Sequence, residues 1–182
     1  AAASDVYKVQ VDGCTTGRFS KGPGGDQGMV AVFEREAGVP AIATSPSVVK
    51  ALTHFGAKKI SVATPYPDWA NARLRNYFER VGFEVLNVDG DPVAQDTGNQ
   101  GYNNHDPERV VEFAASICSP DADVLFCSCT AWRSMEAAGR LETQTGRPVV
   151  TSNQATVWAA FHHLGLKPAV DGFGSLLDGL LN

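Results

Sequence analysis

Short apolar β-type runs alternate with helix-type runs along almost the whole chain, and this alternation constrains the fold more than any other feature. The β-type runs span residues 6–12, 40–44, 59–64, 83–88, 123–128 and 148–151. The helix-type runs span residues 26–37, 46–55, 67–81, 106–117, 132–145 and 153–164. Strands that alternate with helices are typical of a parallel sheet covered by helices. The sequence therefore predicts an α/β fold.

Local signals support several of these boundaries, and one segment lacks them. Asp106-Pro107 is typical of a helix start, with an N-cap residue followed by proline at the first helical position. Residues 89–104 are polar and rich in Gly, Asn and Asp, without a helical or strand period. We expect a functional or mobile loop there, the alternative being a disordered surface insertion.

Composition excludes several classes of partner. The net charge of −5 and the absence of a basic cluster argue against nucleic acid, because phosphate binding needs clustered Lys and Arg. No apolar run approaches the roughly 20 residues that span a bilayer, and the first residues lack the regions of a signal peptide. Four cysteines are too few for a disulfide scaffold. These features predict a cytoplasmic protein with reduced thiols and no membrane partner.

The dipeptide Cys-Thr occurs twice, as Cys14-Thr15 and Cys129-Thr130, and each copy closes an apolar strand-like run. Ligands of α/β proteins lie at the carboxyl ends of parallel strands. Two thiols at such ends therefore predict a cleft with one cysteine on each wall, although buried structural cysteines are common. A zinc site at Cys118, Cys127 and Cys129 is disfavoured, because C-x-C without a second spaced pair is a poor zinc signature.

Three other strand ends carry uncharged polar residues. They are Thr44-Ser45, Thr64-Pro65-Tyr66 and Thr151-Ser152-Asn153. Each one alone indicates only a helix cap or a turn. Together they place hydroxyl and amide donors beside the predicted thiols, an environment suited to a carboxylate ligand.

The combined pattern resembles the aspartate/glutamate racemase superfamily, and within it the branch of maleate cis-trans isomerases and arylmalonate decarboxylases. The motifs that carry the resemblance are the two Cys-Thr strand ends, residues 34–40, 63–66 and 148–154, and the tail around residues 171–174. The resemblance implies two similar α/β lobes with parallel sheets flanked by helices. It also implies an active site in the cleft between the lobes that works without a cofactor or a metal.

The resemblance assigns roles residue by residue. It makes Cys14 and Cys129 the catalytic cysteines of the first and second lobes. The residues that it implies for substrate binding are Thr15, Thr16, Tyr66, Asn99 and Thr130. Members of the family begin with a further strand, helix and strand, so we expect this N-terminal part to be missing here. The first lobe would then comprise residues 1–56 and 168–182, and the second residues 57–167.

The resemblance predicts a two-cysteine isomerase of a small dicarboxylate, most like an enzyme that converts maleate to fumarate. Cysteine at both positions argues against an arylmalonate decarboxylase, which keeps only the second. Arg18 and Ala131-Trp132 depart from the residues usual beside the cysteines, which leaves the substrate open. One alternative is a two-thiol racemase of aspartate, glutamate or a related carbon acid. Another is a carboxylate-binding protein without catalysis. A homodimer is compatible with the sequence.

Overall fold

The structure is a computed structural model that describes residues 9–13, 25–168 and 170–181, without the side chains of residues 25–27, 29, 97–100 and 181. Its strands are β1 (Gln10–Asp12), β2 (Ala41–Ala43), β3 (Lys59–Thr64), β4 (Glu84–Gly90), β5 (Val124–Cys127) and β6 (Val149–Thr151). Its α-helices are α2 (Gly25–Ala37), α3 (Thr44–His54), α4 (Asp68–Arg80), α5 (Pro92–Gly101), α6 (Pro107–Ile117), α7 (Ala138–Thr145), α8 (Ser152–Leu164) and α9 (Ser175–Asp178). Short 3₁₀ turns are η1 (Tyr102–Asn104), η2 (Met135–Ala137) and η3 (Gly179–Leu181).

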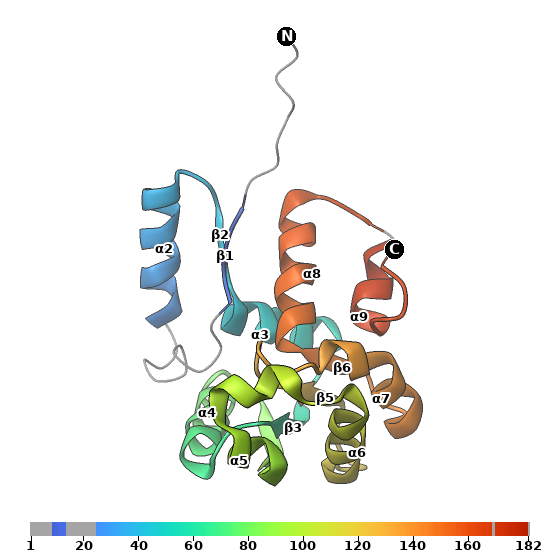
Figure 1. Cartoon of the computed structure of the whole chain (residues 1–182). Coiled ribbons are helices and arrows are strands. Elements are labelled where there is room, and N and C mark those ends of the chain that lie inside the picture. The colour runs from blue at the N-terminus through green and yellow to red at the C-terminus, as the bar shows by residue number, and fades with distance from the viewer. Residues whose placement is uncertain (1–8, 14–24, 169, 182) are drawn as a thin grey trace.

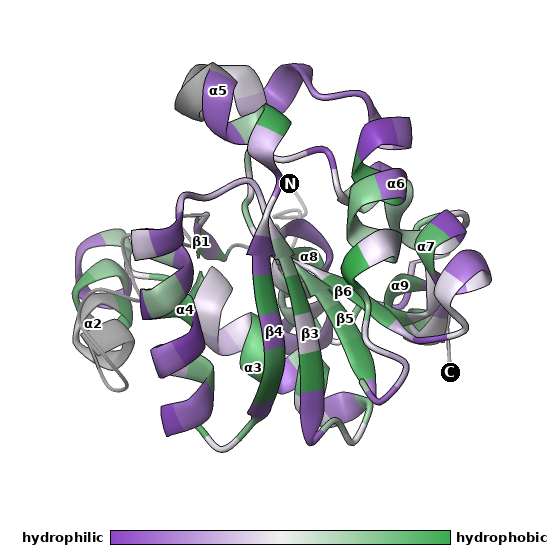
Figure 2. Cartoon of the chain, turned by 90° about the horizontal axis from the view of Figure 1, so that it is seen from below, coloured by the Kyte–Doolittle hydropathy of each residue, from purple (hydrophilic) through white to green (hydrophobic). Residues whose placement is uncertain are grey.

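The strands form two sheets in which every pair is parallel. The smaller sheet pairs β1 with β2, and the larger has the order β4-β3-β5-β6. Every residue of β5 is buried, and so is every residue of β3 after Lys59. Central strands of a parallel sheet have almost entirely apolar sequences, because helices cover both faces of the sheet. Figure 2 shows these hydrophobic strands between helices whose outer surfaces are hydrophilic.

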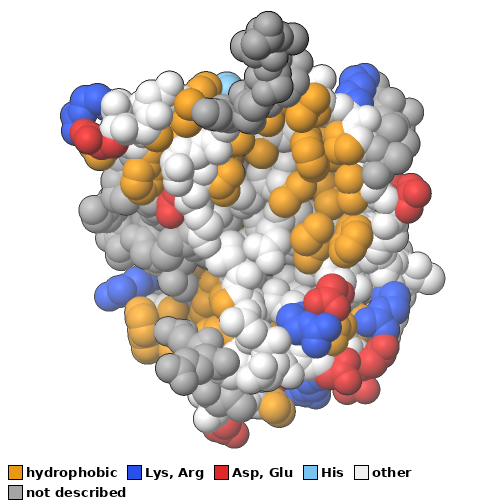
Figure 3. Space-filling model, turned by 45° about the horizontal axis from the view of Figure 1, so that its top comes forward, with side chains coloured by type: hydrophobic (Ala, Val, Ile, Leu, Met, Phe, Trp, Pro, Cys, Tyr) orange, Lys and Arg blue, Asp and Glu red, His pale blue; other side chains and the backbone are white. Residues whose placement is uncertain are grey.

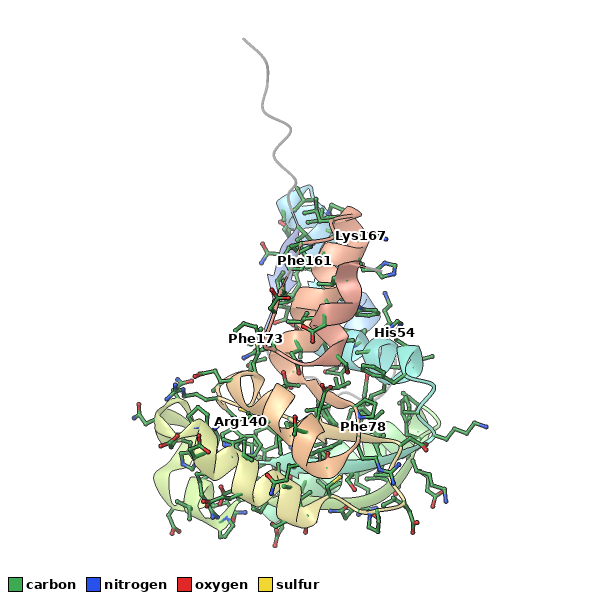
Figure 4. All side chains as sticks on the ribbon, turned by 90° about the vertical axis from the view of Figure 1, so that its right-hand side faces the viewer. His54, Phe78, Arg140, Phe161, Lys167 and Phe173 are labelled. Atoms are coloured by element: carbon green, nitrogen blue, oxygen red, sulfur yellow. The ribbon has the colours of Figure 1, made fainter. Side chains whose placement is uncertain are left out.

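Helices α3 and α8 join the two sheets into one body (Figure 1). The buried positions Val48, Ala51 and Leu52 of α3 and Ala155, Trp158 and Ala159 of α8 recur at the three- and four-residue spacing of one helix face. Both faces belong to one hydrophobic cluster, which also takes in β3, α4, β5 and α9. Figure 4 shows its extent, from Phe78 on α4 to Phe161 on α8.

The tail after α8 folds back onto this cluster. Leu176 and Leu177 of α9 are fully buried, and Leu180 is nearly so. Half-buried hydrophobic side chains also gather on the surface over α8 and α9 (Figure 3); they include Val157, Phe161, Val170 and Phe173. None of the helices in the described part of the chain is long and apolar enough to cross a membrane.

The prediction of a loop over residues 89–104 was wrong. Strand β4 continues to Gly90, and α5 and η1 occupy most of the remainder. Helix α5 starts at Asp91-Pro92, where the Asp91 carboxylate accepts a hydrogen bond from the Val93 N–H at 3.0 Å. This is the same N-cap and proline signal that correctly placed α6, but the Gly- and Asn-rich residues behind it masked the helix.

The predicted helix over residues 132–145 is shorter than expected. Residues 131–134 form turns, η2 follows, and α7 begins only at Ala138. The division into lobes of residues 1–56 with 168–182 and of 57–167 stays a prediction. Helix α8, from the predicted second lobe, packs along α3 and α9 of the first, so the two sheets share one core.

Candidate active site

The order of the larger sheet predicts where a ligand would bind. The chain runs from β3 to β4 on one side of β3 and later returns to β5 on its other side. The carboxyl ends of β3 and β5 therefore flank a topological switch point, where α/β sheets form a crevice for ligands. Tyr66 follows the end of β3, and Cys129 follows the end of β5. Both residues are predicted site residues, and tertiary folding places both at this edge of the sheet.

Cys129 has an unusual backbone. Its φ angle is 107°, and it is the one non-glycine residue with a positive φ in the described part of the chain. L-residues adopt such angles rarely because Cβ meets the neighbouring carbonyl group. The Cys129 N–H donates to the Ser152 hydroxyl oxygen at 3.1 Å, and its carbonyl accepts from the Trp132 N–H at 3.3 Å. Cys129 is 7% exposed, so its thiol sits at the edge of the packed interior.

A hydrogen bond joins the ends of β1 and β5. The Thr130 hydroxyl donates to the Gly13 carbonyl oxygen at 2.7 Å, across 117 residues of sequence. Gly13 directly precedes Cys14 in the sequence. Cys14, Thr15 and Thr16 themselves lie outside the described residues. The described contact therefore brings the segment before the first Cys-Thr pair against the second pair.

Tyr66 is held by side chains from three elements. Its N–H donates to the Thr64 hydroxyl oxygen at 3.0 Å, and its carbonyl accepts from the Asn71 and Gln95 amides, each at 3.1 Å. The Thr64 hydroxyl in turn donates to Asn71 Oδ1 at 2.7 Å. Its position on the helix after Tyr66 leaves Asn71 open, from sequence alone, as a site contact or as part of a solvated helix face. In the structure it is buried and supports the main chain of Tyr66.

Gly90, at the end of β4, makes this arrangement of Tyr66 possible. A Cβ atom at Gly90 would lie 2.2 Å from the Tyr66 carbonyl oxygen and 2.5 Å from Gln95 Nε2. Both distances are far below van der Waals contact, so only glycine fits there. The sequence offered no signal for this role, because a glycine between a strand and Asp91-Pro92 also fits an ordinary turn.

Tyr102 lies beside the predicted site residues Tyr66 and Cys129, and the sequence did not reveal this because Tyr102 falls in the segment wrongly predicted as a loop. Its ring meets the Tyr66 ring edge to face, with the centroids 6.4 Å apart. Burial raises the pKa of the Tyr102 hydroxyl, and the nearby Cys129 sulfur raises it further. The hydroxyl therefore stays protonated at neutral pH and remains a hydrogen-bond donor. Asn99 lies in α5, three residues earlier, and its side chain is outside the described set.

The turn after Cys129 presents backbone donors. Within the described residues, neither the Thr130 N–H nor the Ala131 N–H donates to another group. Successive backbone N–H groups in a turn with one left-handed residue form a concavity that binds anions. These donors suit one carboxylate of a small acid next to the Cys129 thiol.

The other two described thiols belong to different surroundings. Cys127 is fully buried inside β5, and burial raises its pKa far above that of an ordinary thiol. Cys118 caps α6 and is half-buried, and its pKa is also raised by burial. Over the described parts of the chain, no three His, Cys, Asp or Glu side chains are grouped as metal ligands.

Most of the chain has clear relatives in sequence. A family profile described as arylmalonate decarboxylase matches residues 4–177. The chain belongs to the arylmalonate decarboxylase family. The maleate isomerase of Pseudomonas putida strain KT2440 is 33% identical over 150 residues, which are 82% of this chain and 59% of that protein. The arylmalonate decarboxylase of Bordetella bronchiseptica is 27% identical over 163 residues, 88% of this chain and 67% of that protein.

The fold agrees with these relatives. The crystal structure of the maleate isomerase Iso from Pseudomonas putida S16 matches with a TM-score of 0.87 and 26% identity, covering 95% of this chain and 71% of that one. The predicted α/β fold with parallel sheets flanked by helices is confirmed, as is the resemblance to the maleate isomerase and arylmalonate decarboxylase branch. The chain spans 59% and 58% of the length of two of the curated maleate isomerases that it matches.

Proposed function

We propose that this family member is a cofactor-independent two-cysteine isomerase of a small dicarboxylate, converting maleate to fumarate. The observation that carries the proposal is the hydrogen bond from the Thr130 hydroxyl to the Gly13 carbonyl. It links the strand end before Cys14 to the strand end that carries Cys129, which is the arrangement that two thiols acting on one small molecule require. The relatives named as maleate isomerases support the same substrate class.

In the proposed reaction, the Cys14 thiolate adds to one carbon of the maleate double bond while the Cys129 thiol protonates the other. The product is a succinyl thioether, in which the former double bond is a single bond and rotates. The Cys129 thiolate then removes a proton from the same carbon, the carbon–sulfur bond breaks, and fumarate leaves with the Cys14 thiolate restored. No atom or electron is gained or lost overall, so the reaction needs no cofactor.

The carboxylates of the substrate would be held by neutral donors. The proposed donors are the backbone N–H groups of Thr130 and Ala131 together with Tyr66 for one carboxylate, and Thr15 and Thr16 for the other. As the thiolate adds, negative charge spreads onto the carboxylate next to the second carbon. Donors held in place before the reaction stabilise that charge without reorganising. Asn99 stays a proposed substrate ligand.

The test follows the vinyl proton signals of maleate and fumarate by NMR in the purified chain. Cys14→Ala is expected to abolish isomerisation. Cys129→Ser is expected to lower the rate of isomerisation about 10²–10⁴-fold, which is the usual contribution of general acid–base catalysis. Cys118→Ser is the matched control, since it removes a thiol outside the site. Mass spectrometry of the Cys129→Ser variant with maleate should find an adduct on Cys14.

Two results would contradict this assignment. An adduct on Cys129 in the Cys14→Ser variant would show that the two roles are reversed. Exchange of the α-proton of aspartate or glutamate into deuterated water, without any maleate adduct, would show the two-thiol racemase instead. A cytoplasmic location and a homodimer also remain proposals, and light scattering of the purified chain tests the second.

A further inference from the structure

The strained backbone at Cys129 needs support from its surroundings. A non-glycine residue far from the allowed regions persists only where neighbouring contacts hold it, and such residues concentrate at functional sites. The φ angle of Cys129 sets the direction of its Cα–Cβ bond relative to the preceding main chain, so this backbone helps to determine where the thiol points. The groups that hold the main chain before and after Cys129 therefore control where the sulfur points.

Two side chains of α8 bond to the main chain on either side of Cys129. Ser152 Oγ accepts the N–H of Cys129 at 3.1 Å. Asn153 Nδ2 donates to the carbonyl oxygen of Thr130 at 3.1 Å. One bond fixes the peptide unit before Cys129, and the other fixes the second unit after it. Both come from the first turn of a single helix, so they act as one clamp.

The start of α8 is itself fixed. Thr151 and Gln154 form a capping box, in which the Thr151 hydroxyl accepts from the Gln154 N–H at 3.1 Å and Gln154 Oε1 accepts from the Thr151 N–H at 2.9 Å. Thr151 also ends β6, where it pairs with Cys127 of β5. Ser152 is fully buried. Ser152 and Asn153 are thus anchored to the same sheet that carries Cys129, and their backbone has little freedom to move.

We propose that Ser152 and Asn153 are positioning residues for the reaction: they hold the left-handed backbone of Cys129 and so aim its thiol at the substrate carbon. They do this through the main chain and need not touch the substrate. The inference rests on the proposed isomerase function for its kinetic consequence. Its structural part, the control of the Cys129 thiol, is measurable without any turnover.

The kinetic test uses Ser152→Ala, which removes the acceptor, and Asn153→Asp, which keeps the shape but cannot donate to the Thr130 carbonyl. A misplacement of about 1 Å costs about 10²-fold in rate. We expect kcat for maleate to fall about tenfold to hundredfold in each variant, with KM changing far less than kcat. The matched control is Ser47→Ala, which removes a buried hydroxyl that bonds to the Ala43 carbonyl at the start of α3.

The second readout is the rate of alkylation by iodoacetamide, resolved by peptide mass spectrometry. In Ser152→Ala and Asn153→Asp, the rate at Cys129 should rise at least severalfold, because a released main chain opens a thiol that is now nearly buried. Cys118, the residue that follows α6, serves as the reference thiol in the same molecule, and its alkylation rate should not change. In Ser47→Ala neither rate should change.

Thermal melting first confirms that each variant is folded. A folded Ser152→Ala protein whose Cys129 alkylation rate equals that of Ser47→Ala overturns the inference. So does a loss of kcat that merely follows the unfolded fraction. If the unmodified chain does not isomerise maleate, the proposed function fails, and the alkylation rates alone then decide whether Ser152 and Asn153 control Cys129.

Discussion

Replacing Cys129 by glycine and by alanine measures the strain stored at this residue. Both substitutions remove the thiol, so they differ only in Cβ and in backbone freedom. At an ordinary buried strand position, glycine is less stable than alanine for two reasons. It loses about 0.5–1 kcal/mol more backbone entropy on folding, and it forgoes about 0.8 kcal/mol from burying one methyl group. The expected deficit is therefore about 1.5 kcal/mol.

The φ angle of 107° at Cys129 changes this balance. A non-glycine residue in such a region carries about 1–3 kcal/mol of strain, which glycine does not have. Subtracting the ordinary deficit of about 1.5 kcal/mol leaves Cys129→Gly between about 0.5 kcal/mol less stable and about 1.5 kcal/mol more stable than Cys129→Ala. Cys127, two residues earlier and fully buried in β5, has no positive φ and provides the matched control.

The assay is urea unfolding followed by circular dichroism, with the free energy of unfolding compared within each Gly and Ala pair. The step from alanine to glycine at residue 129 should be more favourable than the same step at residue 127 by about 1–3 kcal/mol. For a chain of 182 residues, each kcal/mol of change in the free energy of unfolding shifts the melting temperature by about 2–4 °C. Equal alanine-to-glycine steps at the two positions would refute the claim that the Cys129 backbone is strained.

Three further predictions concern the groups around the site. Gly90→Ala should lower both stability and activity, because its Cβ would overlap the Tyr66 carbonyl; circular dichroism and NMR turnover check this, and a variant equal to the parent contradicts it. Arg109→Met should destabilise the fold, because it removes the guanidinium that lies 2.9 Å from the buried Asp91 carboxylate. Breaking a fully buried ion pair costs about 3–5 kcal/mol. The loss here should be smaller, because Arg109 is partly exposed to solvent. Burial raises the pKa of Cys127 above its ordinary value of 9.0, so above pH 9 the unfolded chain loses this proton while the folded chain keeps it. The free energy of unfolding should then fall by about 1.4 kcal/mol per pH unit from this group, and Cys127→Ala should lack that slope.

Much of the local structure could be predicted from sequence because its causes are local. The alternation of apolar strand runs with helical runs predicted the parallel α/β fold, and Asp106-Pro107 marked the start of α6, where the Asp106 carboxylate caps the Glu108 N–H at 3.0 Å. The segment from residue 89 to 104 shows the limit of this reasoning. Asp91-Pro92 is an equally good start signal, yet the weak helix formers after it obscured α5. Contacts with the rest of the fold outweigh their low helix propensity: Asp91 pairs with Arg109 of α6, and the Gln95 amide donates to the Tyr66 carbonyl after β3.

By itself, the sequence determined that two Cys-Thr pairs close two strand-like runs, and that polar residues follow the other strand ends. It did not determine which strand ends become neighbours. The spacing of apolar residues along a strand predicts which of its sides is buried. The pairing of one parallel strand with another depends instead on how the helices between them pack. Only the tertiary structure placed β3 between β4 and β5, so that Tyr66 meets Tyr102 near Cys129. Only it joined Thr130 to Gly13, because a hydrogen bond across 117 residues leaves no trace in local sequence.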